Sequence, residues 1–166
     1  LELDELQQLV LPFEAAFFAK LGLGAEYVGH PLLDRGPMPE RAAARARFGI
    51  GAGERVLGLF PGSRHGEVQR MWAPFRDAAH RLLAAKACDR VLVAATAREA
   101  YPDPGAIEVH RDDPLPVFSA ADAAIAKSGT TTLEAELADT PMVVAYRAHP
   151  FTSWLSRRLL TVPYVS

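Results

Sequence analysis

Short segments that are apolar throughout recur along the chain and alternate with segments of helical character. Three of them are VLGLF (56–60), VLVAA (91–95) and MVVAY (142–146). A strand with one face in water alternates apolar and polar residues, whereas a strand covered by helices on both faces is apolar along its whole length. The βαβ order of these segments therefore predicts an α/β fold with an open, mostly parallel, Rossmann-like sheet and helices on both faces.

The helical periodicity between the apolar runs sets the expected boundaries. Pro74 is expected to begin its helix, because proline fits the first helical turn and breaks a helix interior. The expected strands cover residues 6–11, 26–28, 56–60, 91–95, 107–109, 123–126 and 142–146, and the expected helices cover residues 13–21, 40–48, 74–86, 115–120, 131–138 and 151–160.

The segment LLDRGPMPE (32–40) contains two prolines and a glycine, which is typical of a linker. The chain begins at Leu1 and opens directly on strand-like sequence, as expected for a piece of a longer protein. We therefore expect residues 1–34 to be the end of a preceding domain and a hinge, and residues 35–166 to form the Rossmann-like domain.

The composition argues against several classes of protein. The 166 residues carry a formal net charge of −2, whereas a general nucleic-acid binder is basic, so no nucleic-acid partner is expected. Cys88 is the only cysteine, so neither an internal disulfide nor a cysteine zinc cluster can form, and a reducing, cytoplasmic setting is favoured. The five histidines lack metal-ligand spacing, so we expect no metal and no cofactor. We expect neither a signal peptide nor a membrane span.

The first candidate binding loop follows the expected strand 56–60, in the stretch LFPGSRHGEV. Ligands of open α/β sheets bind beyond the carboxyl ends of the strands. Gly62 lets the backbone approach a ligand, Ser63 can donate a hydrogen bond, and the planar guanidinium of Arg64 suits phosphate oxygens. The alternative is an ordinary turn with a surface arginine.

The second candidate loop follows the expected strand 123–126, in the stretch AKSGTTTLEAEL. Helix N-termini attract phosphates, and Ser128, Gly129 and Thr130 add hydroxyl donors and a close backbone approach. A capping box, with Thr131 as N-cap and Glu134 reaching back, is the simpler reading of part of this stretch. Two such loops after two strands of one sheet indicate a ligand with a diphosphate, and Glu134 could then accept hydrogen bonds from a ribose diol.

Other apparent binding or catalytic motifs do not meet the requirements of the sites that they resemble. GIGAGE (49–54) resembles a dinucleotide fingerprint but precedes a strand, and the sequence has no GxxxxGK[ST] motif of a P-loop ATPase or kinase. GSRHG (62–66) is not the GxSxG motif of hydrolases. Asp112 and Asp113 precede Pro114 and favour a helix-start turn over a catalytic pair.

The segment HPFTSWLSRRLLTVPY (149–164) places Phe151, Trp154 and several leucines on one helical face, with Arg157 and Arg158 nearby. This composition suits an interfacial helix on a membrane surface. A helix packed on the sheet or on a partner domain explains it as well, and we favour that alternative.

Several stretches in order along the chain resemble the lipid-A-disaccharide synthase family: PFEAAFF, YVGHPLLD, LFPGSRHGEV, AKSGTTTLEAELADTPMVVAYR and VPYVS. The resemblance implies one half of a two-domain GT-B glycosyltransferase on the inner-membrane face of Gram-negative bacteria. In that family, diacylglucosamine is transferred from its UDP-linked donor onto diacylglucosamine 1-phosphate, which forms the lipid A disaccharide and releases UDP.

The resemblance also implies roles for residues and partners. Arg64 matches the arginine of the family's PGSR loop and is the candidate catalytic residue. Ser128, Gly129, Thr130 and Glu134 match the second nucleotide-binding stretch. The expected partners are a UDP-sugar donor, a glycolipid acceptor, an N-terminal domain that this chain lacks, and a peripheral contact with the inner membrane.

The chain departs from the family pattern at both ends. Without an N-terminal domain it lacks the acceptor site and a base, and residues 35–166 resemble a UDP-sugar-binding domain truncated at its C-terminus. We therefore expect this chain alone to be inactive. Two alternatives stay open: the donor domain of another UDP-N-acetylglucosamine-using transferase or epimerase, and a non-catalytic nucleotide-sugar-binding module.

Overall fold

The computed structural model describes residues 7–10, 12–96 and 98–147. The chain divides into two compact units, Leu1–Pro37 and Met38–Ser166. The helix expected at 151–160 lies outside the described residues.

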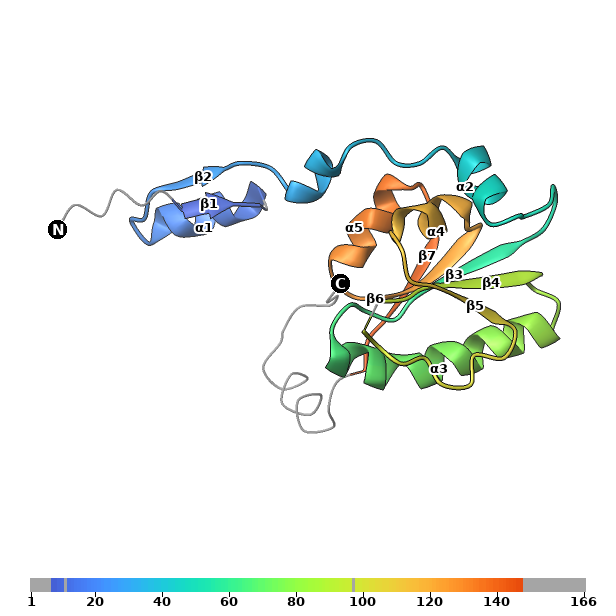
Figure 1. The fold of residues 1–166 in the computed structure, drawn as a ribbon. Helices are drawn as coiled ribbons and strands as arrows, with labels where there is room; N and C mark the ends of the chain where they lie inside the picture. Colours follow the sequence, from blue (N-terminus) through green and yellow to red (C-terminus); the bar gives the residue numbers. More distant parts are fainter. Residues whose placement is uncertain (1–6, 11, 97, 148–166) are drawn as a thin grey trace. The chain divides into compact units, whose positions relative to one another are not determined.

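The first unit is a βαβ arrangement (Figure 1). Strand β1 (Gln7–Leu9) pairs in parallel with β2 (Ala25–Tyr27), and helix α1 (Pro12–Lys20) connects them. A 3-10 helix, η1 (Pro31–Arg35), follows and overlaps the start of the predicted linker. It forms because proline suits the first turn of a helix, and because the His30 imidazole Nδ1 accepts a hydrogen bond of 3.1 Å from the Leu32 N–H.

The second unit contains a five-stranded sheet in the order β5-β4-β3-β6-β7, and every pairing is parallel. This confirms the predicted Rossmann-like α/β fold. The strand order reverses at the β3–β6 pair, since the chain builds outward first on one side of β3 and then on the other. The strands are β3 (Val56–Phe60), β4 (Arg90–Ala94), β5 (Ile107–His110), β6 (Ala123–Lys127) and β7 (Met142–Ala145).

Helices cover both faces of this sheet, as predicted (Figure 1). The long helix α3 (His65–Ala84) lies on one face, and α2 (Arg41–Arg47), α4 (Leu115–Ala120) and α5 (Thr130–Leu137) lie on the other. Successive side chains of β3 point to opposite faces, so that Leu57 and Leu59 belong to the α3 core while Val56 and Phe60 belong to the opposite core.

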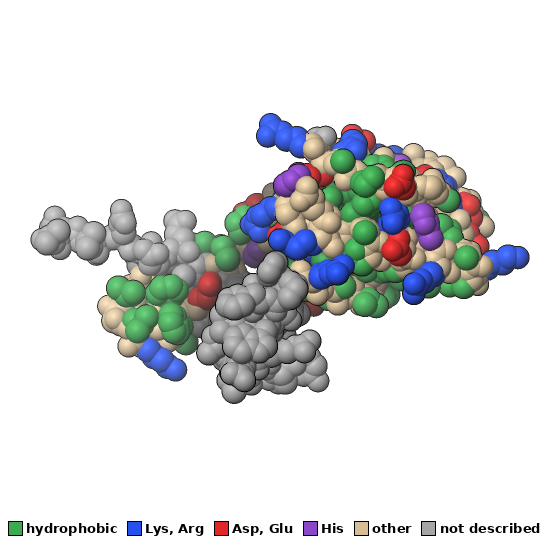
Figure 2. Space-filling model, turned by 90° about the horizontal axis from the view of Figure 1, so that it is seen from below, with side chains coloured by type: hydrophobic (Ala, Val, Ile, Leu, Met, Phe, Trp, Pro, Cys, Tyr) green, Lys and Arg blue, Asp and Glu red, His purple; other side chains and the backbone are tan. Residues whose placement is uncertain are grey.

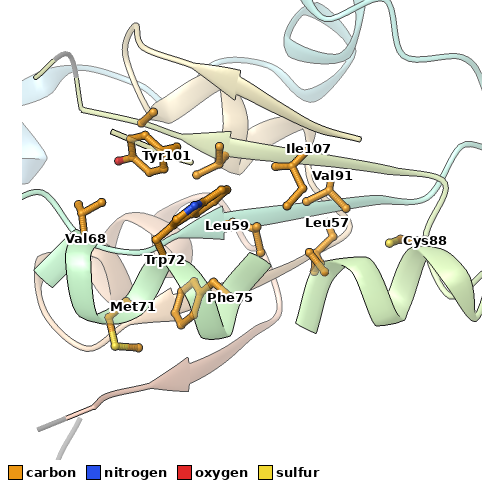
Figure 3. Packing of buried hydrophobic residues seen from close by; sticks show 13 residues of the cluster. Leu57, Leu59, Val68, Met71, Trp72, Phe75, Cys88, Val91, Tyr101 and Ile107 are labelled. Atoms are coloured by element: carbon orange, nitrogen blue, oxygen red, sulfur yellow. The ribbon is translucent and has the colours of Figure 1, made fainter. Parts of the chain in front are cut away.

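The core under α3 combines aromatic residues with the branched side chains of the strands (Figure 3). Trp72 stands edge-on to Tyr101, with ring centroids 5.0 Å apart, and its indole N–H donates to the Pro102 carbonyl oxygen at 2.8 Å. The imidazole Nε2 of His80 lies 3.0 Å from the Pro104 oxygen. These contacts attach the loop between β4 and β5 to α3.

The predicted start of α3 was wrong. The helix begins at His65, and Pro74 lies inside it. A proline removes one backbone hydrogen bond of a helix, but it does not end a helix that is buried on both sides of it. Here the buried residues Val68, Met71, Trp72, Phe75 and Ala79 follow helical spacing across the proline and pack on the sheet. The other expected boundaries within the described residues differ from the observed ones by at most two residues.

Gly58 leaves the space that an aromatic stack needs, and this gives a stability prediction. A Cβ at Gly58 would lie 2.8 Å from the Phe60 ring and 3.2 Å from the Ala121 Cβ. The Phe60 ring is stacked on the Phe118 ring, with ring centroids 3.6 Å apart and an interplanar angle of 2°, and it cannot easily turn away. Gly58→Ala should therefore lower the free energy of unfolding by about 1–3 kcal/mol, as overpacking does.

Urea unfolding of the variant measures this loss. Gly66→Ala is the matched control, because the nearest atom to its Cβ would be an Arg70 guanidinium nitrogen at 3.4 Å, on a flexible side chain. Alanine also favours a helix, so the control should lose no stability. Equal stability of Gly58→Ala and the parent would contradict the packing argument.

Candidate functional site

The sheet brings the two predicted loops to one place. Phe60 of β3 lies opposite Ala126 of β6, so the two neighbouring strands end at the same edge. Pro61–Arg64 follows β3, and Ser128–Gly129 follows β6. This pair of strands is where the strand order reverses, and in open α/β sheets that switch point opens the crevice that holds a ligand.

Two helix N-termini lie at this edge as well. Helix α3 begins at His65 directly after the first loop, and α5 begins at Thr130 directly after the second (Figure 1). The first N–H groups of a helix have no partner within it, and they carry a partial positive charge. The edge can therefore receive an anion from two directions.

The first loop requires glycine at position 62. Gly62 has a φ of +119°, which side chains rarely permit, and an added Cβ would lie 2.7 Å from both the Cβ and the carboxylate of Glu67. Arg64 is the N-cap of α3, and its side chain is 83% exposed. Ser63 is exposed too. The loop is thus a tight turn that presents an arginine and a serine to solvent.

The second loop differs from its expected capping box. The N-cap of α5 is Gly129, not Thr131, and Gly129 adopts φ +147° and ψ −158°. Glycine reaches this conformation without steric cost, so the helix starts earlier than the threonine predicts. The hydroxyl of Thr132 donates to the Gly129 carbonyl oxygen at 2.7 Å. Glu134 is half-buried in α5, about one turn beyond its start.

An ion pair that the sequence did not reveal joins the start of α3, after the first loop, to the end of β6, before the second loop. Lys127, the last residue of β6, donates from Nζ to Glu67 Oε1 at 3.0 Å, and both side chains are largely buried, with 14% and 13% of their surface exposed. Glu67 Oε1 also accepts from the Arg64 guanidinium at 3.2 Å. Its other oxygen, Oε2, accepts from the backbone N–H groups of Ser63 at 3.2 Å and Arg64 at 3.4 Å.

These contacts set the protonation of Glu67. Burial alone would raise the pKa of its carboxyl group, but the hydrogen bonds from Lys127 and from the Ser63 and Arg64 N–H groups outweigh burial, and the pKa lies below its ordinary value of 4.5. Glu67 is therefore ionised at neutral pH. A local signal for it was available, since a glutamate three residues after an N-cap is the acidic half of a capping box.

A third loop borders the site. After β4, the Glu99 carboxylate lies 2.7 Å from the His65 Nδ1 at the start of α3. The Arg111 guanidinium donates to the backbone oxygens of Thr96 at 2.7 Å and Glu99 at 3.0 Å. The β4–β5 loop is thus attached to the N-terminal end of α3.

Other candidate groups have structural roles. Asp113 accepts from the Leu115 N–H at 3.1 Å and so starts α4, as predicted, while Asp112 pairs with Arg47 at 3.1 Å. Cys88 is buried, and burial raises the pKa of its thiol.

The described part of the chain holds no group of three His, Cys, Asp or Glu that could bind a metal ion. Nor does any of its helices combine the length and the apolar character that a membrane crossing needs.

Comparisons with known proteins point to one family. Residues 3–166 match the family described as lipid-A-disaccharide synthetase. Proteins named lipid-A-disaccharide synthase from Pseudomonas syringae pv. tomato, Pseudomonas fluorescens and Pseudomonas entomophila are 40%, 41% and 44% identical to this chain, each over 98% of its length. The chain covers 45–46% of these relatives, a little under half of their length.

The depressed pKa of Glu67 predicts a stability that depends on pH. Its stabilising contribution is complete above about pH 4.5 and is lost as the pH falls through the lower pKa of the folded state. Glu67→Gln should lower the free energy of unfolding near neutral pH by about 1–3 kcal/mol, since hydrogen bonds to a charged group are lost. The difference between the parent and this variant should shrink in acid.

Urea unfolding at about pH 7 and about pH 3 measures this difference. Glu136→Gln makes the same charge change at an exposed position of α5, and its effect should be small at both pH values. A Glu67→Gln deficit that is as large in acid as at neutral pH would show that the ion pair is not its source.

Proposed function

Since the chain belongs to the lipid-A-disaccharide synthase family, we propose that it is the donor-binding part of a glycosyltransferase of lipid A biosynthesis. In this proposal residues 35–166 hold the diphosphate of UDP-diacylglucosamine. The full-length protein transfers the sugar to diacylglucosamine 1-phosphate, so that the lipid A disaccharide and UDP are formed.

One observation carries the proposal: two loops that suit an anion meet at the switch point of the sheet. Each is followed by a helix N-terminus, and the guanidinium of Arg64 is exposed beside them. A diphosphate carries negative charge on both of its phosphoryl groups, and N–H groups, hydroxyls and a guanidinium fork are the donors that bind it.

The proposed roles follow from position. Gly62 and Ser63 bring the backbone and a hydroxyl to one phosphoryl group, and Ser128, Gly129 and Thr130 do the same from the second loop. Glu134, about one turn into α5, accepts hydrogen bonds from the ribose diol.

Arg64 is proposed to act in the chemical step. When the acceptor hydroxyl attacks the anomeric carbon, the bond to the diphosphate breaks and its electron pair leaves with UDP. Negative charge therefore grows on the diphosphate, and a cation placed there stabilises the transition state more than the ground state.

The first unit supports the proposal that residues 1–34 belong to another domain of the full-length protein. A two-stranded parallel sheet does not bury its own faces, and parallel sheets are normally covered on both sides. Apolar side chains gather on the visible face of this unit (Figure 2), and Phe17, Leu21 and Tyr27 are 59%, 59% and 48% exposed. We propose that the missing part of the protein completes this sheet and supplies the acceptor site and the base.

The ligand is tested by calorimetry with uridine, UMP and UDP. If the two loops hold a diphosphate, UDP should bind more tightly than UMP, and UMP more tightly than uridine. Part of the preference should persist in added salt, because an arginine–phosphate fork in a crevice is screened less than an exposed charge pair. Equal affinities for the three compounds would refute the diphosphate site.

The role of Arg64 is tested by Arg64→Lys in the full-length protein. Lysine keeps the charge but loses the planar fork. We expect both turnover and donor affinity to fall, because the fork contacts the group on which charge develops. Lys86→Arg, an exposed position beyond the other end of α3, is the control and should leave both unchanged. A higher KM with intact turnover would mean that Arg64 only holds the donor.

A further inference from the structure

The donor groups of the first loop are not vacant in this structure, because they surround a carboxylate of the protein itself. Glu67 accepts from the backbone N–H groups of Ser63 and Arg64, from the Arg64 guanidinium and from the Lys127 ammonium. Two backbone N–H groups, a guanidinium and an ammonium form the donor set that a phosphoryl group would take.

We propose that Glu67 is an internal counter-ion which the diphosphate of the donor displaces, and that Lys127 is thereby released to bind the diphosphate. The inference rests on the proposed function, since it concerns the same site. It adds a binding residue, Lys127, and a competing anion, Glu67, to the loops already described.

Burial makes Glu67 and the diphosphate compete strongly for the same donor groups. Both partners of the ion pair are less than 15% exposed, so their interaction is screened far less than that of a surface pair. If the carboxylate stayed in place, a phosphoryl group on the same N–H groups would lie against a negative charge, which is repulsive. The space beside Gly62 is already occupied by Glu67, because a Cβ added at residue 62 would lie 2.7 Å from both the Cβ and the Oε2 of Glu67.

Lys127 is positioned to serve either anion. It ends β6, directly before the second loop, and its Nζ is 3.4 Å from the position that a Cβ on Gly129 would take. The centroid of the Tyr146 ring, directly after the neighbouring strand β7, lies 5.8 Å from the same Nζ. A small movement of the ammonium group therefore carries it from the first loop toward the second.

Charge removal at the two positions tests the proposal in the full-length protein. Glu67→Gln removes the competing charge and leaves Lys127 without its counter-ion, so UDP should bind about three- to tenfold more tightly while uridine binds as before. Lys127→Gln should weaken UDP binding about three- to tenfold, again with uridine unchanged. In the double variant, the gain from Glu67→Gln should be smaller than in the parent, because the released cation is missing.

Control variants separate these effects from net charge. Glu136→Gln and Lys86→Gln make the same charge changes at exposed positions outside the two loops, and neither should alter the UDP affinity. Thermal unfolding provides a second readout, since UDP should raise the melting temperature of Glu67→Gln more than that of the parent.

The outcomes are distinct. Unchanged or weaker UDP binding by Glu67→Gln, with the UDP preference of the parent intact, overturns the counter-ion proposal and leaves the proposed function standing. If Glu67→Gln does not fold, unaltered UDP binding by Lys127→Gln overturns it instead. A parent that binds UDP no better than uridine overturns the counter-ion proposal and the diphosphate site together.

Discussion

The parallel pairing of β3 with β6 is the contact on which the rest of the second unit depends. The chain leaves β3 for α3 on one face of the sheet and leaves β6 for α5 on the opposite face. The two connections therefore diverge directly beyond the register pair Phe60–Ala126. The topology alone therefore places a switch point there, before any side chain is specified, and open α/β sheets bind their ligands at such points. The loops only have to supply suitable donors.

The side chains that β3 and β6 contribute differ in size between the two faces of the sheet. The α3 face is filled by Leu57, Leu59 and a row of aromatic residues, whereas β6 presents Ala124 and Ala126 to the opposite core. Small side chains on β6 let the short helices α4 and α5 approach the sheet, and they leave room for the stacked Phe60 and Phe118 rings. The hydroxyl of Thr140, which donates to the Phe118 carbonyl oxygen at 3.0 Å, fixes the turn after α5 against α4. The position of α5, and with it the second loop at the start of α5, thus depends on how α4 and α5 pack on the sheet.

How far the sequence predicts this molecule depends on the range of each interaction. The strand 56–60 and the helix 115–120 have the predicted bounds, because turn-forming residues and a solid apolar run define them locally. Pro74 lies inside α3 and does not begin it, because tertiary packing overrides a local helix breaker. The pair between Glu67 and Lys127 spans 60 positions of the sequence, and no local pattern announces it. Its two residues become neighbours only once β3 and β6 are paired.

The charges at this edge of the sheet explain why a carboxylate can lie among the donors that we propose for a diphosphate. Arg64 and Lys127 carry two positive charges, and the N-termini of α3 and α5 each add roughly half a charge. Glu67 offsets one charge, so this edge of the sheet keeps an excess of positive charge while the buried Lys127 ammonium stays paired. Leaving that ammonium unpaired would cost more than the pair itself contributes, since a lone buried charge is poorly solvated. Glu67 already accepts from both cations, so we propose that a diphosphate displaces it by reaching further, with one phosphoryl group at each of the two loops and their helix N-termini. In this proposal a diphosphate is preferred over a single phosphoryl group because only the diphosphate spans both loops.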